Sequence, residues 1–186
     1  MGVEDLSLDW SLPVPESARR EAAGFTSGSP YLLMSMCQPR LRNFRNWSAE
    51  GYATVVEHAW VQHGLKTVLT GGGSTQEREM GQRIAAQAQP GAVIDAIGES
   101  SLKGLLALID GARAVIAPDS GPVHMANAMG TPTVGLFATT NPERAGPIAG
   151  RISWSIAIPR RCAPTCTRIL TPCPGGSVSV IPTPCR

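Results

Sequence analysis

Four residues, Asp119, Ser120, Gly121 and His124, combine side chains and spacing that suit the binding of a phosphate group. They lie in the run IAPDSGPVHMANAMGTPTVGLFATTNPERAGP at residues 116–147, between an apolar stretch and small residues typical of a helix. The first turn of such a helix presents unpaired N–H groups and partial positive charge. Gly121 lacks a Cβ, so a ligand oxygen can approach the backbone there. The pattern predicts a site for a diphosphate.

The same residues also have a purely structural interpretation. Ser120 is a favourable N-cap, which explains the tripeptide without any ligand. His124, however, follows one helical turn after the cap and on the same side, where its ring N–H would reach a phosphate or sugar oxygen. This shared face favours the binding hypothesis, and the capping role stays open beside it.

The surrounding chain alternates between short apolar runs and amphipathic segments. We expect a short helix at 15–23, strands at 31–36, 66–70, 92–97, 114–118 and 133–137, and helices at 48–63, 74–89, 100–111 and 121–129. Ser48 is expected to cap the start of its helix and Gly64 to end it. The alternation predicts an open parallel sheet, a Rossmann-like α/β domain. Ligands bind such sheets at the carboxyl ends of the strands, where Asp119 lies.

Length, charge and hydropathy narrow the class of protein. A chain of 186 residues is about one domain. Residues 1–150 carry 11 Lys and Arg against 14 Asp and Glu, a net charge of −3, whereas residues 151–186 carry five Arg and no acidic residue, a net charge of +5. The body therefore gives no support for nucleic-acid binding. We expect neither a signal peptide nor a membrane-spanning helix.

Residues 151–186 depart from the strand–helix pattern. They hold six Pro and four of the five Cys, but no CxxC pair, so we expect no zinc site. The pattern predicts an irregular tail. One hypothesis is a shifted reading frame, because codons permitted for residues 150–166 also encode QDLVVDRYPEAVRTYL in an offset frame, an ordinary strand-then-helix sequence. A gene sequence without that offset frame would refute this hypothesis.

The segment DSGPVHMANAMGTPTVGLFATTNPERAGP resembles the signature of the family 9 glycosyltransferases, the heptosyltransferases that build the lipopolysaccharide inner core. The shared features are D-[ST]-G-x-x-H, a helix of small residues, G-x-P, an apolar strand, then T-x-P and G-P. The resemblance covers about residues 30–147. It implies a nucleotide-sugar-binding Rossmann-like domain at 30–150, the C-terminal, donor-binding half of a GT-B architecture. Residues 1–29 are then a linker or a remnant of the N-terminal domain.

The resemblance also implies which residues contact the donor. Asp119, Ser120, Gly121 and His124 match the segment that holds the diphosphate of an ADP-heptose. Three further positions match, each with a structural alternative. Arg45, two residues before Trp47, matches a basic residue of the family, but a solvated loop charge also explains it. Glu77 matches a residue that contacts the ribose or adenine side of the donor, but a carboxylate in the first turn of a helix also suits the helix dipole. Ser100 matches a residue near the adenine pocket, but a helix cap also explains it. Trp47 is expected to pack at the helix start.

The implied reaction is an inverting transfer of heptose from the nucleotide to the lipopolysaccharide core or lipid A, with no cofactor and no metal. The general base is expected in the N-terminal half, which this chain lacks, so we expect the fragment alone to be inactive. The resemblance places the protein in the cytoplasm, at the inner face of the inner membrane. Alternatives are an inactive nucleotide-sugar-binding module, a decayed gene product, or a nucleotide-sugar epimerase-like protein. A nicotinamide site is disfavoured, because the glycines at 71–73 do not form GxGxxG.

Overall fold

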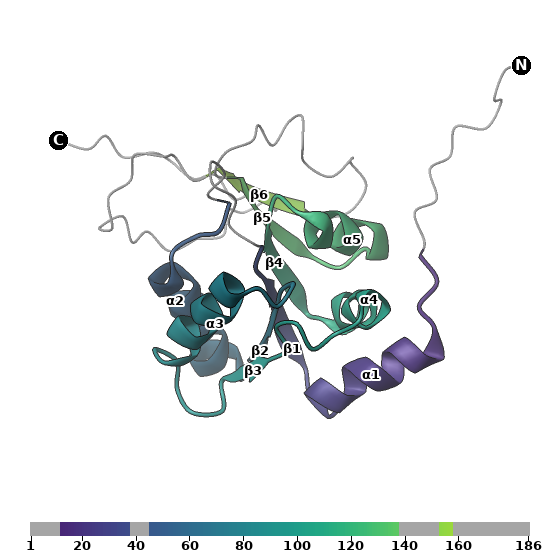
Figure 1. Ribbon diagram of the computed structural model, residues 1–186, viewed down its shortest axis with the longest axis horizontal. Helices are drawn as coiled ribbons and strands as arrows, with labels where there is room; N and C mark the ends of the chain where they lie inside the picture. The colour runs from purple at the N-terminus through teal and green to yellow at the C-terminus, as the bar shows by residue number, and fades with distance from the viewer. Residues whose placement is uncertain (1–11, 38–44, 138–152, 158–186) are drawn as a thin grey trace, which may run out of the picture.

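The computed structural model describes residues 12–37 and 45–137, and the backbone of residues 153–157. Its centre is a sheet of parallel strands in the order β3-β2-β1-β4-β5-β6 (Figure 1). The strands are β1 (Tyr31–Ser35), β2 (Lys66–Thr70), β3 (Val93–Asp95), β4 (Ala114–Pro118), β5 (Thr133–Phe137) and β6 (Ser153–Ala157). The helices are α1 (Glu16–Thr26), α2 (Ala49–His63), α3 (Thr75–Ala85), α4 (Leu102–Gly111) and α5 (Gly121–Met129). The predicted Rossmann-like α/β fold is confirmed.

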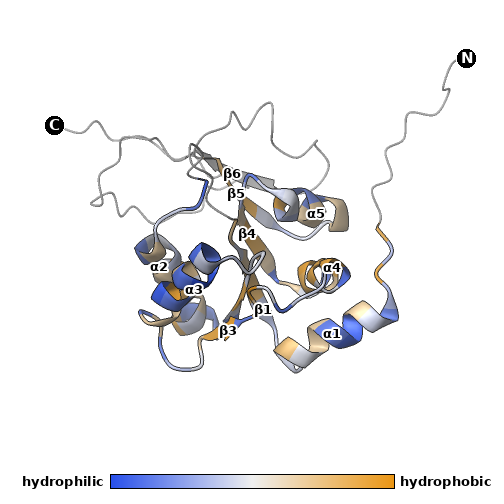
Figure 2. Cartoon of the chain, in the orientation of Figure 1, coloured by the Kyte–Doolittle hydropathy of each residue, from blue (hydrophilic) through white to orange (hydrophobic). Residues whose placement is uncertain are grey.

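Helices cover both faces of the sheet, so its central strands are buried on both sides. Along β1, Leu32 and Met34 pack with α2 and α3, whereas Tyr31 and Leu33 pack with α1, α4 and α5. Figure 2 shows hydrophobic residues gathered on the strands and on α4, and hydrophilic residues on α1 and α3. Burial of apolar surface from two layers of helices explains why β1 reads as a continuous apolar run with no polar alternation.

Most predicted boundaries agree with the structure to within a residue or two. The Ser48 hydroxyl accepts a hydrogen bond from the Gly51 N–H at 3.1 Å, and Gly64 ends α2 with φ +62°. The helix after the triple glycine is shorter than predicted, because beyond Ala85 the chain turns through i→i−3 hydrogen bonds. The third strand is also shorter, since the Asp95 carboxylate accepts from the Ile97 N–H at 3.0 Å and turns the chain.

Two segments outside the predicted core pack against it. Helix α1, three residues longer at its C-terminus than predicted, lies against α4, where Ala18 and Ala22 are buried and Arg19 pairs with Asp110 at 2.8 Å. Strand β6 lies in the region predicted to be irregular and pairs in parallel with β5. The irregular-tail prediction is therefore wrong over these five residues, because the free edge of β5 supplies a partner that the local sequence does not reveal. Residues 158–186, with all four tail Cys, lie outside the described residues.

The buried phenol of Tyr31 gives a pH-dependent test of this packing. Its hydroxyl donates to the Leu108 carbonyl at 2.6 Å, and burial, with the charge of Asp110, raises the pKa of Tyr31 to about 12. Tyr31→Phe is expected to cost about 1–2 kcal/mol of unfolding free energy at pH 7. Because the raised pKa favours the neutral phenol in the folded state, this advantage is complete below pH 10 and is lost as the pH rises from 10 through about 12. Urea unfolding at pH 7 and pH 11 measures it, and a difference between the two chains that does not change with pH would contradict the assignment.

Candidate functional site

The strand order reverses direction between β1 and β4, and this reversal marks the candidate site. From β1 the chain continues through α2 and β2 to one side of the sheet, whereas β4 continues through α5 and β5 to the other side. The helices that follow the two strands, α2 and α5, therefore pack on opposite faces of the sheet. Open α/β sheets bind their ligands in the crevice at such a point.

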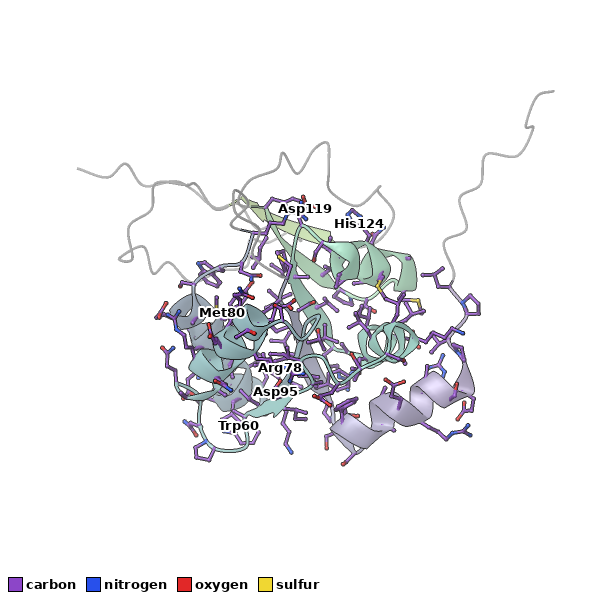
Figure 3. The ribbon with its side chains drawn as sticks, in the orientation of Figure 1. Trp60, Arg78, Met80, Asp95, Asp119 and His124 are labelled. Atoms are coloured by element: carbon purple, nitrogen blue, oxygen red, sulfur yellow. The ribbon has the colours of Figure 1, made fainter. Side chains whose placement is uncertain are left out.

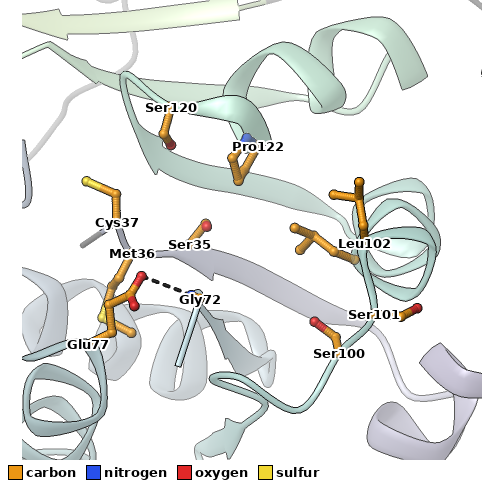
Figure 4. Close-up of a pocket in the computed structure, with 12 residues that line it drawn as sticks. Ser35, Met36, Cys37, Gly72, Glu77, Ser100, Ser101, Leu102, Ser120 and Pro122 are labelled. Carbon is orange, nitrogen blue, oxygen red and sulfur yellow. Dashed lines mark hydrogen bonds between the residues drawn. The ribbon is translucent and has the colours of Figure 1, made fainter. Parts of the chain in front are cut away.

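A cavity of about 360 Å³ occupies this edge. Its walls come from the end of β1, the loop after β2, and the starts of α4 and α5 (Figure 4). The lining residues are Ser35, Met36, Cys37, Gly71, Gly72, Glu77, Ser100, Ser101, Leu102, Leu105, Ser120 and Pro122. The volume lies in the range of small-molecule binding sites.

The start of α5 opens on this cavity without a side-chain cap. Ser120 occupies the N-cap position, but its hydroxyl donates to the Pro118 carbonyl at 2.9 Å and makes no cap hydrogen bond. The predicted capping role of Ser120 is therefore wrong, because the turn after β4 points the hydroxyl back toward the strand. Among the residues that the structure describes, a Cβ added to Gly121 would meet no atom of another residue within 4 Å, so these residues leave the space beside this backbone open. The arrangement leaves the positive end of α5 accessible to an anion.

Arg45 joins the two loops that flank the reversal point. Its Nη1 donates to the Asp119 carbonyl at 2.7 Å, although the two residues are 74 positions apart. The guanidinium carries further N–H groups in a planar fork that matches phosphate oxygens. The bond places a cation beside the first turn of α5, where the helix dipole already favours negative charge.

The buried carboxylate of Glu77 organises the glycine-rich wall of the cavity. Glu77 is 3% exposed, and its two oxygens accept from the Gly72 N–H at 2.9 Å and from the Ser74 N–H at 2.9 Å, with the Ser74 hydroxyl at 2.6 Å. Ser74 in turn accepts from the Glu77 N–H, which completes a capping box at the start of α3. Glu77 therefore has the structural role of a carboxylate at the start of a helix, and its contact with the ribose or adenine of a donor stays a prediction.

The wall opposite Glu77 is formed by the start of α4. Here the cap role falls on Ser101, which accepts from the Gly104 N–H at 2.9 Å, while the neighbouring Ser100 lines the cavity. Leu102 also lines it with 74% of its surface exposed, an unusual position for a large apolar side chain. This apolar surface suits the face of a flat ring.

The structure places three of the seven predicted site residues in the cavity wall and leaves the other four, Asp119, Gly121, Arg45 and His124, outside the lining. Ser120, Glu77 and Ser100 line the cavity, and Arg45 reaches the backbone of Asp119 at its edge. His124 is exposed on α5 and is not among the lining residues; Figure 3 shows it and Asp119 on the same side of the molecule.

Sequence reasoning missed the end of β1, Ser35, Met36 and Cys37, which forms part of the cavity wall. The signal was available, because these residues follow the first strand directly at the carboxyl edge. Trp47 packs edge-to-face on Tyr52 with ring centroids 5.9 Å apart, which confirms its predicted packing role.

Comparisons with known proteins agree on one family. The model of glycosyltransferase family 9 (heptosyltransferase) matches residues 2–171. The lipopolysaccharide core heptosyltransferase OpsX of Haemophilus influenzae is 33% identical over 148 residues, which is 79% of this chain and 42% of the relative. Lipopolysaccharide heptosyltransferase 1 of Pseudomonas aeruginosa is 33% identical over 171 residues, 87% of this chain and 45% of the relative. The chain thus spans about half the length of the curated relatives it matches.

A solved structure supports the same relationship. A family 9 glycosyltransferase from Veillonella parvula superposes with a TM-score of 0.67 at 26% identity, covering 79% of this chain and 42% of the other. The family match extends on both sides of the resemblance at 30–147, and so includes α1 and β6. Among the described residues, no helix is long and apolar enough to cross a membrane.

The glycine wall of the cavity can be tested with a matched pair of variants. Gly73 and Gly91 both have φ +85°, but a Cβ on Gly73 would lie 2.9 Å from the Gly98 Cα, whereas a Cβ on Gly91 would meet nothing within 4 Å. Gly91→Ala is expected to cost about 1–2 kcal/mol of unfolding free energy, from its backbone conformation alone. Gly73→Ala is expected to cost clearly more in the same urea titration, because the two backbones must also separate. Equal losses of unfolding free energy in the two variants would contradict a close approach of the backbones at Gly73 and Gly98.

Proposed function

Because this chain belongs to glycosyltransferase family 9, the heptosyltransferases, we propose that its domain binds the nucleotide-activated heptose of a transfer to lipopolysaccharide. The relatives that it matches are named as lipopolysaccharide heptosyltransferases. The proposed donor is ADP-heptose, as the resemblance implies. We propose that binding of this donor requires neither a cofactor nor a metal in this domain.

One observation carries the proposal: the start of α5 lacks a side-chain cap and lies beside the Arg45 guanidinium at the reversal point of the sheet. A diphosphate brings negative charge to a helix N-terminus and an arginine, both of which stabilise it. When the bond between heptose and phosphate breaks, further charge develops on the leaving diphosphate. Groups held in place before the reaction stabilise that charge most effectively.

The predicted donor residues take distinct places in this proposal. The backbone at Ser120 and Gly121 and the side chain of Arg45 contact the diphosphate, and the bond to the Asp119 carbonyl orients Arg45. His124 contacts the donor from the next turn of α5, outside the cavity proper. The nucleoside lies along the wall that holds Ser100, Leu102 and Glu77, where Leu102 covers one face of the base.

Activation of the acceptor is proposed to depend on residues outside the described domain. An acceptor hydroxyl on the lipopolysaccharide core or lipid A attacks the anomeric carbon, and a carboxylate base takes its proton. The chain spans 42% of the OpsX relative, so the acceptor surface and base are proposed to belong to the remaining part of that architecture. The reaction would take place at the inner face of the inner membrane.

Titration calorimetry tests donor binding and the part played by His124. We expect ADP-heptose to bind more tightly than ADP, and both more tightly than UDP-sugars. His124→Ala is expected to weaken ADP-heptose binding by about tenfold, because it removes a hydrogen bond to a charged or sugar oxygen. His58→Ala, at an exposed histidine on α2 that does not line the cavity, serves as the matched control and should leave affinity unchanged. Preference for UDP-sugars would instead contradict ADP-heptose as the donor.

A transfer assay tests the division of roles. The purified 186-residue chain is mixed with ADP-heptose and heptose-free lipopolysaccharide, and products are followed by mass spectrometry. We expect bound donor without transferred heptose, with the complete OpsX relative as the positive control. Heptosyl transfer by this chain alone would contradict the proposed location of the acceptor surface and base.

A further inference from the structure

We propose that Asn46 is a positioning residue for the donor site: its side-chain amide clasps the backbone of Cys37 at the end of β1 and so sets the place from which Arg45 reaches α5. This inference rests on the proposed function, because Arg45 is the cation offered to the diphosphate there. Asn46 itself does not line the cavity and is not proposed to touch the ligand.

The clasp consists of two complementary hydrogen bonds. The Asn46 Nδ2 donates to the Cys37 carbonyl at 2.6 Å, and the Asn46 Oδ1 accepts from the Cys37 N–H at 3.0 Å. The Cys37 thiol also lies 3.5 Å from the same oxygen. A primary amide supplies a donor and an acceptor together, as a neighbouring peptide group would in a sheet. A carboxylate lacks the donor, and an aliphatic side chain lacks both groups.

The chain immediately after Asn46 is also fixed. The Trp47 N–H donates to the hydroxyl of the buried Tyr52 at 3.3 Å, and the Trp47 ring lies where a side chain on Gly51 would have to go. Ser48 then caps α2. Asn46 is therefore anchored to the end of β1 through its side chain and to the start of α2 through its neighbour.

Arg45 extends from this anchored point toward the other side of the reversal. Its Nη1 reaches the Asp119 carbonyl at 2.7 Å, directly before the N-cap of α5. Cys37 lines the cavity on one side and Ser120 on the other. Loss of the clasp would leave Arg45 with its charge but without its fixed approach, so binding of the phosphates should weaken while contacts to the nucleoside remain.

A double-mutant cycle on the 186-residue chain tests this role, with ADP and adenosine as the calorimetric probes. Asn46→Ala is expected to weaken ADP binding by about tenfold, as expected for loss of a well-aligned charged hydrogen bond, with adenosine affinity unchanged. In the Arg45→Ala background, Asn46→Ala should change ADP affinity by less than about twofold, because Asn46 is proposed to act on ADP only through Arg45, and the effects of coupled residues do not add. Asn46→Gln keeps the amide but lengthens the side chain, and should reproduce the loss if Asn46→Ala does not fold.

Ser48→Ala is the control for a merely structural effect. It removes the cap of α2 two residues away, at a cost of stability typical of a lost N-cap, and should leave ADP affinity within about twofold. Equal losses from Asn46→Ala with and without Arg45, or a matching loss in Ser48→Ala, would overturn the positioning role while leaving the donor site intact. Failure of the unsubstituted chain to bind ADP would instead contradict the proposed function, and with it the site that Asn46 serves.

Discussion

Strands β1 and β4 are neighbours in the sheet, yet the chain leaves them toward opposite faces, and this constraint determines where a ligand can bind. The helices that follow the two strands lie on opposite faces of the sheet, and among the described residues no helix covers the carboxyl edge between the strands. The cavity, the open start of α5 and the bridge from Arg45 to Asp119 all lie at this edge. The site is thus a consequence of topology that particular side chains then refine.

Backbone groups held by a few polar side chains give the edge its shape. Glu77 holds the glycine-rich loop after β2, Asn46 holds the end of β1, and Arg45 holds the backbone before α5. Each of these side chains hydrogen-bonds peptide groups at the end of a strand or beside the start of a helix. The same use of side chains on backbone leaves the α5 terminus itself accessible, because Ser120 turns away from it.

The fold could be predicted from sequence because its signals are local. Apolar runs of five residues, cap residues such as Ser48 and stop glycines such as Gly64 define the elements, and strand–helix alternation leads to a parallel sheet. One failure has a non-local cause and the other a local one. Strand β6 forms because the edge of β5 offers a partner, and Ser120 does not cap because of the turn geometry after β4.

The candidate site was only partly predictable, because some of its residues take their roles from contacts that residue type alone does not reveal. Residue types and spacing pointed to Ser120, and the family resemblance pointed to Glu77 and Ser100; all three line the cavity. Asn46 has a role only through its contact with Cys37, nine residues away. The most direct test of the account is an amide chemical-shift titration of the ¹⁵N-labelled chain with ADP. We predict the largest saturating shifts at the N–H groups of Ser120 and Gly121, with smaller ones at the loop after β1. Saturating shifts confined to the outer surface of α2 or α3, or no shifts at millimolar ADP, would contradict it.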